Sequence, residues 1–313
     1  MNHSKLRFFA TGGRHGWMRL YLGCTVWLLW PFTVAAVPGA DESMGAGTLA
    51  YHLATNTAAY AGGRAGDYGD LLEITAPNSR GLDRLTNAVW SRSFWLKDVR
   101  GLSATPIGFS NVLGGQGLPT MVSPRHYLCA THMHPESYMI AFLDTNDVVH
   151  WRRSLQRVNL GNDTSVGLLN EDLPPSVGFL PVLPANYTNY LPTTARSFVQ
   201  GIGMNQDMLL FSQPITFAYV PMVGWNSAKT VPMGPAKNWN VMIRAGDSSN
   251  PEMLLIGDQL VLVSHNYFAT GGPNYAWQMA DINASMHRLS TNNHAGTDYQ
   301  LTVFPLTNWP AIR

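Results

Sequence analysis

Three residues far apart in this chain are of the types that together activate a serine for attack on a carbonyl group. His132 follows "CAT", Asp163 directly precedes the apolar run "TSVGLL", and Ser248 lies in the turn "RAGDSSNP". A serine hydroxyl is a poor nucleophile at neutral pH and needs a hydrogen-bonded base to take its proton. Histidine suits this task because its ordinary pKa is about 6.5, and a carboxylate can fix its tautomer. The pattern therefore predicts a nucleophile, a base and an orienting acid.

Other aspartates compete for the role of the acid. Asp144 and Asp147 lie in "FLDTNDVV", a pattern typical of a hairpin turn. We prefer Asp163 because an apolar strand follows it directly. A serine in a polar turn such as Ser248 is by default structural, and only the ordered set of three favours catalysis.

The base also has an alternative, because His134 lies two residues after His132. Histidines at i and i+2 share one face of a strand, a spacing that can ligate a metal ion. No third ligand is recognisable by spacing, so we expect no metal site and prefer His132, which follows small residues. Cys129 is expected to be a small buried residue rather than a nucleophile.

Short apolar or alternating segments dominate the chain from about residue 96 onwards. Gly, Pro, Asn or Asp usually separates them, which indicates many strands without intervening helices and favours an antiparallel barrel or sandwich. The expected strands cover 120–123, 138–144, 147–160, 165–169, 178–184, 207–220, 240–245, 253–265 and 300–306, and 277–290 is expected to form a helix.

The first 95 residues differ from the rest. Basic residues followed by the apolar run "LYLGCTVWLLW" and the small residues "TVAA" predict a signal peptide over residues 1–36, cleaved after Ala36, although a membrane anchor is the alternative. Residues 37–95 are interpreted as a partly helical extension, with Leu82, Leu85 and Val89 at helix-like spacing. Removal of the signal leaves Cys129 as the single cysteine, so no intrachain disulfide is expected.

The residues around the three candidates resemble the trypsin/chymotrypsin-like serine peptidases. "VSPRHYLCATH" is similar to that family's strand and turn before the catalytic histidine, "DTSVGLL" to its aspartate and following strand, and "GDSSNP" to its nucleophile loop. The resemblance implies two six-stranded antiparallel β-barrels over residues 96–313. It also implies that His132, Asp163 and Ser248 form a catalytic triad.

Further roles follow from the same resemblance. The N–H groups of Gly246 and Ser248 would form the oxyanion hole, Ser264 would begin the strand that pairs with substrate, and Met242 would lie at the floor of an apolar specificity pocket. Ser249 stands where the family nearly always has Gly. In many members the residue matching Asp247 binds a new amino terminus, but no sequence of the Ile-Val-Gly-Gly kind precedes "GLPTMVS". We therefore expect Asp247 to hold the loop through local hydrogen bonds.

These observations predict an exported serine endopeptidase, secreted or periplasmic, that acts on a protein or peptide through an acyl-enzyme. This chemistry needs neither a metal nor an organic cofactor. An inactive protease-fold binding protein is the alternative, and a metal-binding β domain is a third. Charged residues make up 12% of the chain and the net charge is +1, so no nucleic-acid partner is expected. No stable membrane insertion is expected after signal cleavage.

Overall fold

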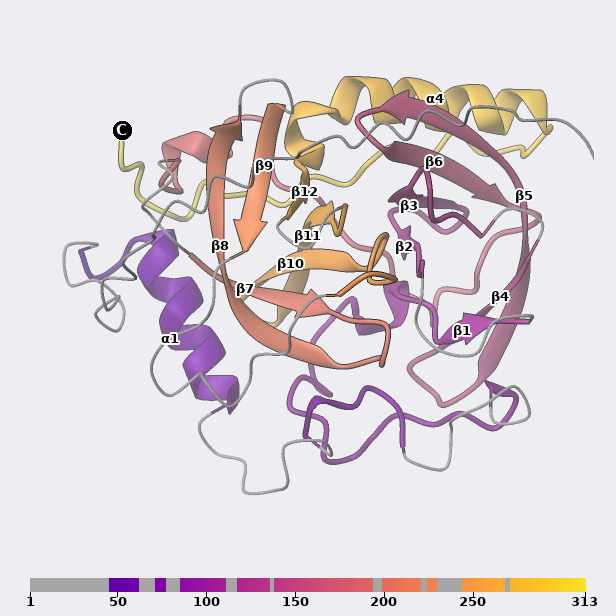
Figure 1. Ribbon diagram of the computed structural model, residues 1–313, viewed down its shortest axis with the longest axis horizontal. Coiled ribbons are helices and arrows are strands. Elements are labelled where there is room, and N and C mark those ends of the chain that lie inside the picture. The colour runs from indigo at the N-terminus through magenta and orange to yellow at the C-terminus, as the bar shows by residue number, and fades with distance from the viewer. Residues whose placement is uncertain are drawn as a thin grey trace, which may run out of the picture. The chain divides into compact units, whose positions relative to one another are not determined.

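The strands form two six-stranded antiparallel sheets in the part of the chain that the computed structural model describes (Figure 1). That part comprises residues 45–61, 71–76, 85–110, 117–135, 138–193, 199–220, 224–229, 244–267 and 271–313. The expected signal peptide and Met242 lie outside it. The prediction of a mostly β chain with few helices is confirmed, whereas closure of each sheet into a barrel stays a prediction.

The first sheet has the strand order β1-β4-β5-β6-β3-β2 and the second the order β11-β10-β7-β8-β9-β12. The first contains β1 (Gly108–Phe109), β2 (Thr120–Met121), β3 (His126–Ala130), β4 (Met139–Leu143), β5 (Val149–Gly161) and β6 (Thr164–Leu169). The second contains β7 (Val199–Met204), β8 (Leu210–Val220), β9 (Gly224–Lys229), β10 (Pro251–Ile256), β11 (Gln259–His265) and β12 (Gly271–Pro273). The helices are α1 (Leu49–Ala61) and α4 (Met279–Asn292), with short 3-10 turns at Leu102–Ala104, Tyr187–Asn189 and Tyr275–Trp277.

Two of the expected strands are wrong. Within 178–184, Val182 makes only isolated parallel bridges, to Leu262 and Val303, and 300–306 contributes only the second of these. Pro181 and Pro184 flank the bridge, and proline has no N–H to donate to a sheet. The 240–245 segment falls mostly outside the described residues.

The segment interpreted as an extension belongs to the same compact unit as both sheets, which runs from Ala36 to Arg313. Leu49 and Leu53 of α1 lie one turn apart and are fully buried with residues of the second sheet. Further along, the buried Trp95 donates its indole N–H to the Leu210 carbonyl at 2.9 Å. The helix face expected from Leu82, Leu85 and Val89 is wrong at Val89, which lies outside any helix and is 41% exposed, while Leu82 lies outside the described residues. The extension thus contributes to the core.

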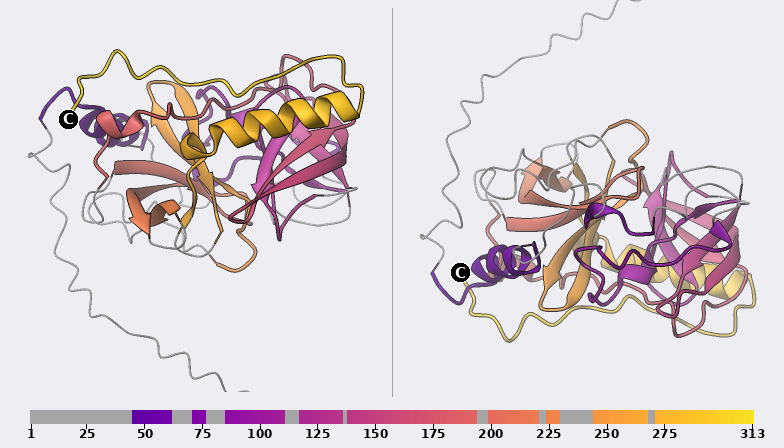
Figure 2. Two further views of the ribbon diagram at one scale, coloured as in Figure 1. Left: turned by 90° about the horizontal axis from the view of Figure 1, so that it is seen from above. Right: turned by 90° about the horizontal axis from the view of Figure 1, so that it is seen from below.

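Helix α4 packs across β5 and β6, as the views in Figures 1 and 2 agree. Its buried residues Ile282, Met286 and Leu289 recur at three- and four-residue spacing, which forms one apolar face. The following segment runs back towards α1, where Trp309 and His52 have ring centroids 4.5 Å apart (Figure 2). This end of the chain therefore spans both sheets and contacts the N-terminal helix.

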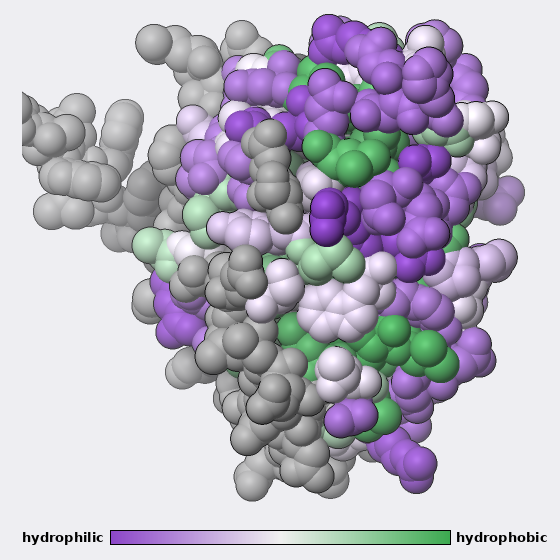
Figure 3. All heavy atoms as spheres, turned by 90° about the vertical axis from the view of Figure 1, so that its right-hand side faces the viewer, coloured by the Kyte–Doolittle hydropathy of each residue, from purple (hydrophilic) through white to green (hydrophobic). Residues whose placement is uncertain are grey.

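The outer face of the first sheet is mixed in character, with apolar groups scattered between polar ones (Figure 3). Near β5 the large exposed apolar side chains are Val148, 49% exposed, and Leu155, 42% exposed. Single exposed apolar residues are normal on protein surfaces. Among the described residues of this face, these exposed side chains do not specify a partner.

Candidate active site

Strand register brings His132 and Asp163 together. β3 pairs with β6 so that Ala130 lies opposite Thr164, and the Thr131 N–H donates to the Asp163 carbonyl at 2.8 Å. His132 therefore follows β3 at the point where Asp163 precedes β6. Asp163 is in the two-residue turn between β5 and β6, with φ of 55°, a left-handed conformation that Asp and Asn tolerate in such hairpins.

The Asp163 carboxylate bonds the histidine through both oxygens. Its Oδ2 lies 2.5 Å from His132 Nδ1, and its Oδ1 accepts the His132 backbone N–H at 3.0 Å. The acid is largely buried, with an exposed side-chain fraction of 11%, whereas that of His132 is 48%. The two bonds fix the rotation of the carboxylate and leave Nε2 of the ring facing away from it.

The second sheet supplies the nucleophile. Ser248 lies in the loop just before β10, and its Oγ is 2.9 Å from His132 Nε2. The three residues predicted from sequence thus form one continuous hydrogen-bonded chain from acid to base to hydroxyl. With Nδ1–H donated to Asp163, Nε2 is left with a lone pair for the Ser248 hydroxyl proton.

The competing residues lie elsewhere or make other contacts. Asp144 caps the turn between β4 and β5 and bonds His150 Nε2 at 2.9 Å, and Asp147 accepts the Trp90 N–H at 2.7 Å. Among the described residues, no group of three or more His, Cys, Asp or Glu is placed to hold a metal ion. Cys129 is buried in β3, and burial raises the pKa of its thiol.

The two predicted oxyanion donors are in the same loop. Gly246 has a φ of 99°, which favours glycine. Within the described residues, the N–H groups of Gly246 and Ser248 have no acceptor in the protein. They are therefore available to a developing oxyanion, and that role stays a prediction.

The Ser264 side chain does not face a substrate. It lies in β11, is fully buried, and its hydroxyl donates to Glu252. The role expected for it rests on the backbone of the strand and stays a prediction.

Asp247 holds the nucleophile loop through backbone donors, as expected from its sequence context. Its carboxylate is fully buried and accepts the Gln206 N–H and the Arg244 N–H, each at 2.6 Å. Gln206 belongs to the turn between β7 and β8, and its side chain also donates to the Ala245 carbonyl at 3.1 Å. The loop is therefore fastened to the second sheet immediately before Ser248.

Replacing Asp247 with asparagine should lower the free energy of unfolding by about 2 kcal/mol, because an amide NH₂ at this buried position would face one of the two backbone N–H donors. Urea unfolding of the purified chain measures this. Asp207→Asn is the matched control, since Asp207 pairs with Arg244 at the surface and such pairs contribute roughly 0–1 kcal/mol. Equal destabilisation by both substitutions would contradict a special role for the buried carboxylate.

A buried polar pair that sequence reasoning missed lies at the end of β11. His265 Nδ1 bonds the Tyr275 hydroxyl, and both side chains are fully buried. Burial lowers the pKa of His265 to about 3, against the opposing effect of the Asp163 carbonyl. His265 is thus neutral and lies next to the Asp163 backbone. Its place in "VLVSHN" gave no signal of this contact, which depends on the position of Tyr275.

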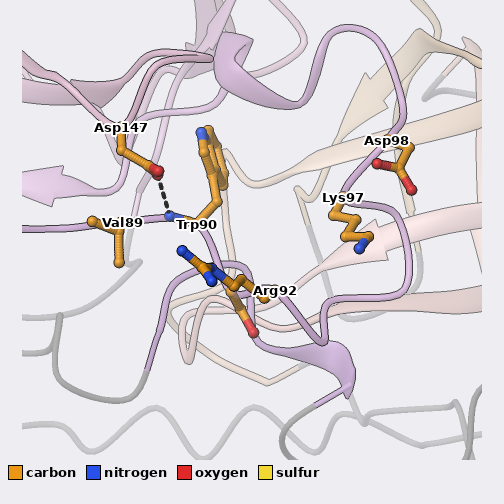
Figure 4. Close-up of a pocket in the computed structure, with 7 residues that line it drawn as sticks. Val89, Trp90, Arg92, Lys97, Asp98 and Asp147 are labelled. Carbon is orange, nitrogen blue, oxygen red and sulfur yellow. Dashed lines mark hydrogen bonds between the residues drawn. The ribbon is translucent and has the colours of Figure 1, made fainter.

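A separate surface hollow of about 280 Å³ lies around Trp90 (Figure 4). Its lining includes Arg92, Lys97 and Asp98 but no member of the Ser248 site. Asp147 points into it only to accept the Trp90 N–H. The hollow has mixed charge and open sides, so it specifies no ligand class.

No protein-family model matches the chain, and no curated protein gives a significant match. In the described residues, no helix combines the length and the apolar character needed to cross a bilayer.

Proposed function

We propose that this chain is an exported serine endopeptidase that cleaves peptide bonds through an acyl-enzyme on a chymotrypsin-like pair of β-barrels. The observation that carries the proposal is the continuous chain from Asp163 through His132 to Ser248, at 2.5 and 2.9 Å. Two antiparallel six-stranded sheets, each contributing to this chain, also support it. Export rests on the signal-like first 36 residues.

The reaction begins when Ser248 Oγ attacks the substrate carbonyl and His132 Nε2 takes its proton. Asp163 holds Nδ1–H and stabilises the imidazolium. The N–H groups of Gly246 and Ser248 would bind the oxyanion of the tetrahedral intermediate. His132 then returns the proton to the leaving amine, which breaks the peptide bond and leaves Ser248 acylated. Water, deprotonated by His132, hydrolyses the ester and restores the serine.

A fluorophosphonate probe tests the proposal directly, because it forms a bond only with an activated nucleophile. We expect one probe per chain on the wild type, located at Ser248 by peptide mass spectrometry, and no labelling of Ser248→Ala. Ser154→Ala is the matched control, since Ser154 is a buried serine bonded to the Tyr127 hydroxyl at 2.6 Å, and it should label like the wild type.

A folded wild-type chain that neither reacts with the probe nor cleaves a denatured protein would overturn the proposal and favour a protease-fold binding protein. Labelling at another serine would also contradict it. Circular dichroism shows whether each variant is folded.

A further inference from the structure

Ser249, next to the nucleophile, holds its backbone in a conformation that serine rarely adopts. Its φ is 74°, in the left-handed region that favours glycine, and its side chain is fully buried. A non-glycine residue in this region is strained and persists where its side chain gains specific contacts. The structure shows two such contacts.

The Ser249 hydroxyl bridges the turn that carries His132. Its Oγ accepts the Ala130 N–H at 2.8 Å and donates to the Met133 carbonyl. These two groups belong to the ends of one turn, which is also closed by a Met133 N–H to Ala130 carbonyl bond at 3.3 Å. The hydroxyl therefore holds both ends of the segment that contains His132.

The backbone of Ser249 is also hydrogen-bonded to the second sheet, to which the nucleophile loop belongs. Its N–H donates to the Asn266 carbonyl at 2.9 Å, just beyond β11, and the Asn266 N–H in turn donates to the Asn250 carbonyl at 2.8 Å. Ser249 thus joins the nucleophile loop of the second sheet to the histidine turn of the first. The distance between Ser248 Oγ and His132 Nε2 depends on the relative placement of these two segments.

We propose that Ser249 is a positioning residue that sets the contact between Ser248 and His132 through its hydroxyl. This inference rests on the proposed peptidase function and adds to it a residue that touches neither substrate nor the reacting atoms. The left-handed backbone aims the Ser249 side chain away from Ser248 and into the histidine turn, and the two buried hydrogen bonds hold that turn in register with the nucleophile.

Ser249→Gly is the decisive variant, because glycine adopts the backbone without strain and lacks only the hydroxymethyl group. We expect kcat and the rate of fluorophosphonate labelling to fall about 10–100-fold, the effect of a displacement of about 1 Å in an active site, with little change in KM. Ser249→Ala, which also removes the hydroxyl but keeps the strain, should lose as much activity and more stability. Ser154→Ala controls for the loss of a buried hydroxyl and should keep the wild-type kcat.

A purely structural role would change the unfolding free energy without changing kcat of the folded chain, so an unaltered kcat in Ser249→Gly overturns the proposal. Nuclear magnetic resonance of the His132 ring tests it independently of activity. We expect Ser249→Gly to change the chemical shifts of the ring, since the bonds to Asp163 and Ser248 loosen. Unchanged ring signals in Ser249→Gly would overturn the positioning role, even if the wild type proved inactive. If the ring signals change but the wild type is not labelled by the probe, only the peptidase function is overturned.

Discussion

Replacing Asp163 with asparagine is expected to lower kcat for peptide hydrolysis by about 10⁴-fold while the chain stays folded. The reason lies in the two bonds that Asp163 makes. Oδ1 accepts the His132 backbone N–H at 3.0 Å, and this bond selects which atom of an asparagine takes that place. The amide oxygen must accept the N–H, so the amide NH₂ faces His132 Nδ1.

The consequence for the base is a reversed tautomer. Nδ1 of His132 then accepts from the asparagine NH₂, and the ring proton moves to Nε2, which faces Ser248 Oγ at 2.9 Å. An Nε2 that carries a proton cannot take another from the serine. The Asp163 carboxylate faces the histidine, so we expect substrate binding and KM to change little while kcat falls.

Asp144→Asn is the matched control for this substitution. Asp144 is also an aspartate in a hairpin turn of the first sheet and also bonds a histidine, His150. We expect its kcat to stay near that of the wild type, although stability should fall. Steady-state kinetics on a fluorogenic peptide measures both variants. A wild-type kcat in Asp163→Asn would exclude Asp163 as the orienting acid.

Residue types and order were sufficient to select the chemical groups of this site. The histidine, aspartate and serine were each found at the edge of a predicted strand, and antiparallel pairing places such edges together. The mostly β character followed from short apolar segments broken by turn residues. Periodicity was misleading at 178–184, where the prolines prevent the ladder that an apolar run otherwise favours.

Contacts between distant segments were beyond the sequence. Nothing in "GDSSNP" indicates that the Ser249 hydroxyl reaches the turn around His132, because that contact depends on how the two sheets meet. The burial of Trp95 in the shared core was equally hidden, since the helix-like spacing in segment 37–95 does not indicate what that segment packs against. Departures such as Ser249 are understood only once their partners in space are known.

The free energy of unfolding is expected to fall as the pH drops from about 6.5 to about 4, chiefly through buried neutral histidines. His126 is fully buried between β3 and α4, with Nδ1 2.9 Å from Ser123 Oγ and Nε2 3.1 Å from Ser290 Oγ. Burial lowers the pKa of His126 to about 4 from its ordinary value of 6.5, and the nearby Arg125 acts in the same direction. The Met286 carbonyl, Asp172 and Asp298 oppose this shift without overcoming it.

The direction follows from which state binds the proton. Between about pH 6.5 and pH 4 the unfolded chain protonates this histidine and the folded chain does not, so acid favours unfolding. A pKa depressed from 6.5 to about 4 corresponds to about 3 kcal/mol, present in full above pH 6.5 and lost by about pH 4. The pKa of the buried His265 is lowered to about 3, so its contribution to the free energy of unfolding continues to fall below pH 4.

Urea unfolding at about pH 7.5 and about pH 4.5 measures the effect. Between these two pH values the free energy of unfolding should differ by roughly 2–3 kcal/mol less in His126→Gln than in the wild type, because glutamine stays neutral throughout. His265 should maintain part of the pH dependence. His287→Gln, which removes an exposed histidine from the same helix, controls for the loss of a titratable ring. An equal reduction in both variants would show that burial between β3 and α4 is not the source. Kinetics measured at the same pH values would separate a loss of activity in the folded chain from unfolding driven by His126.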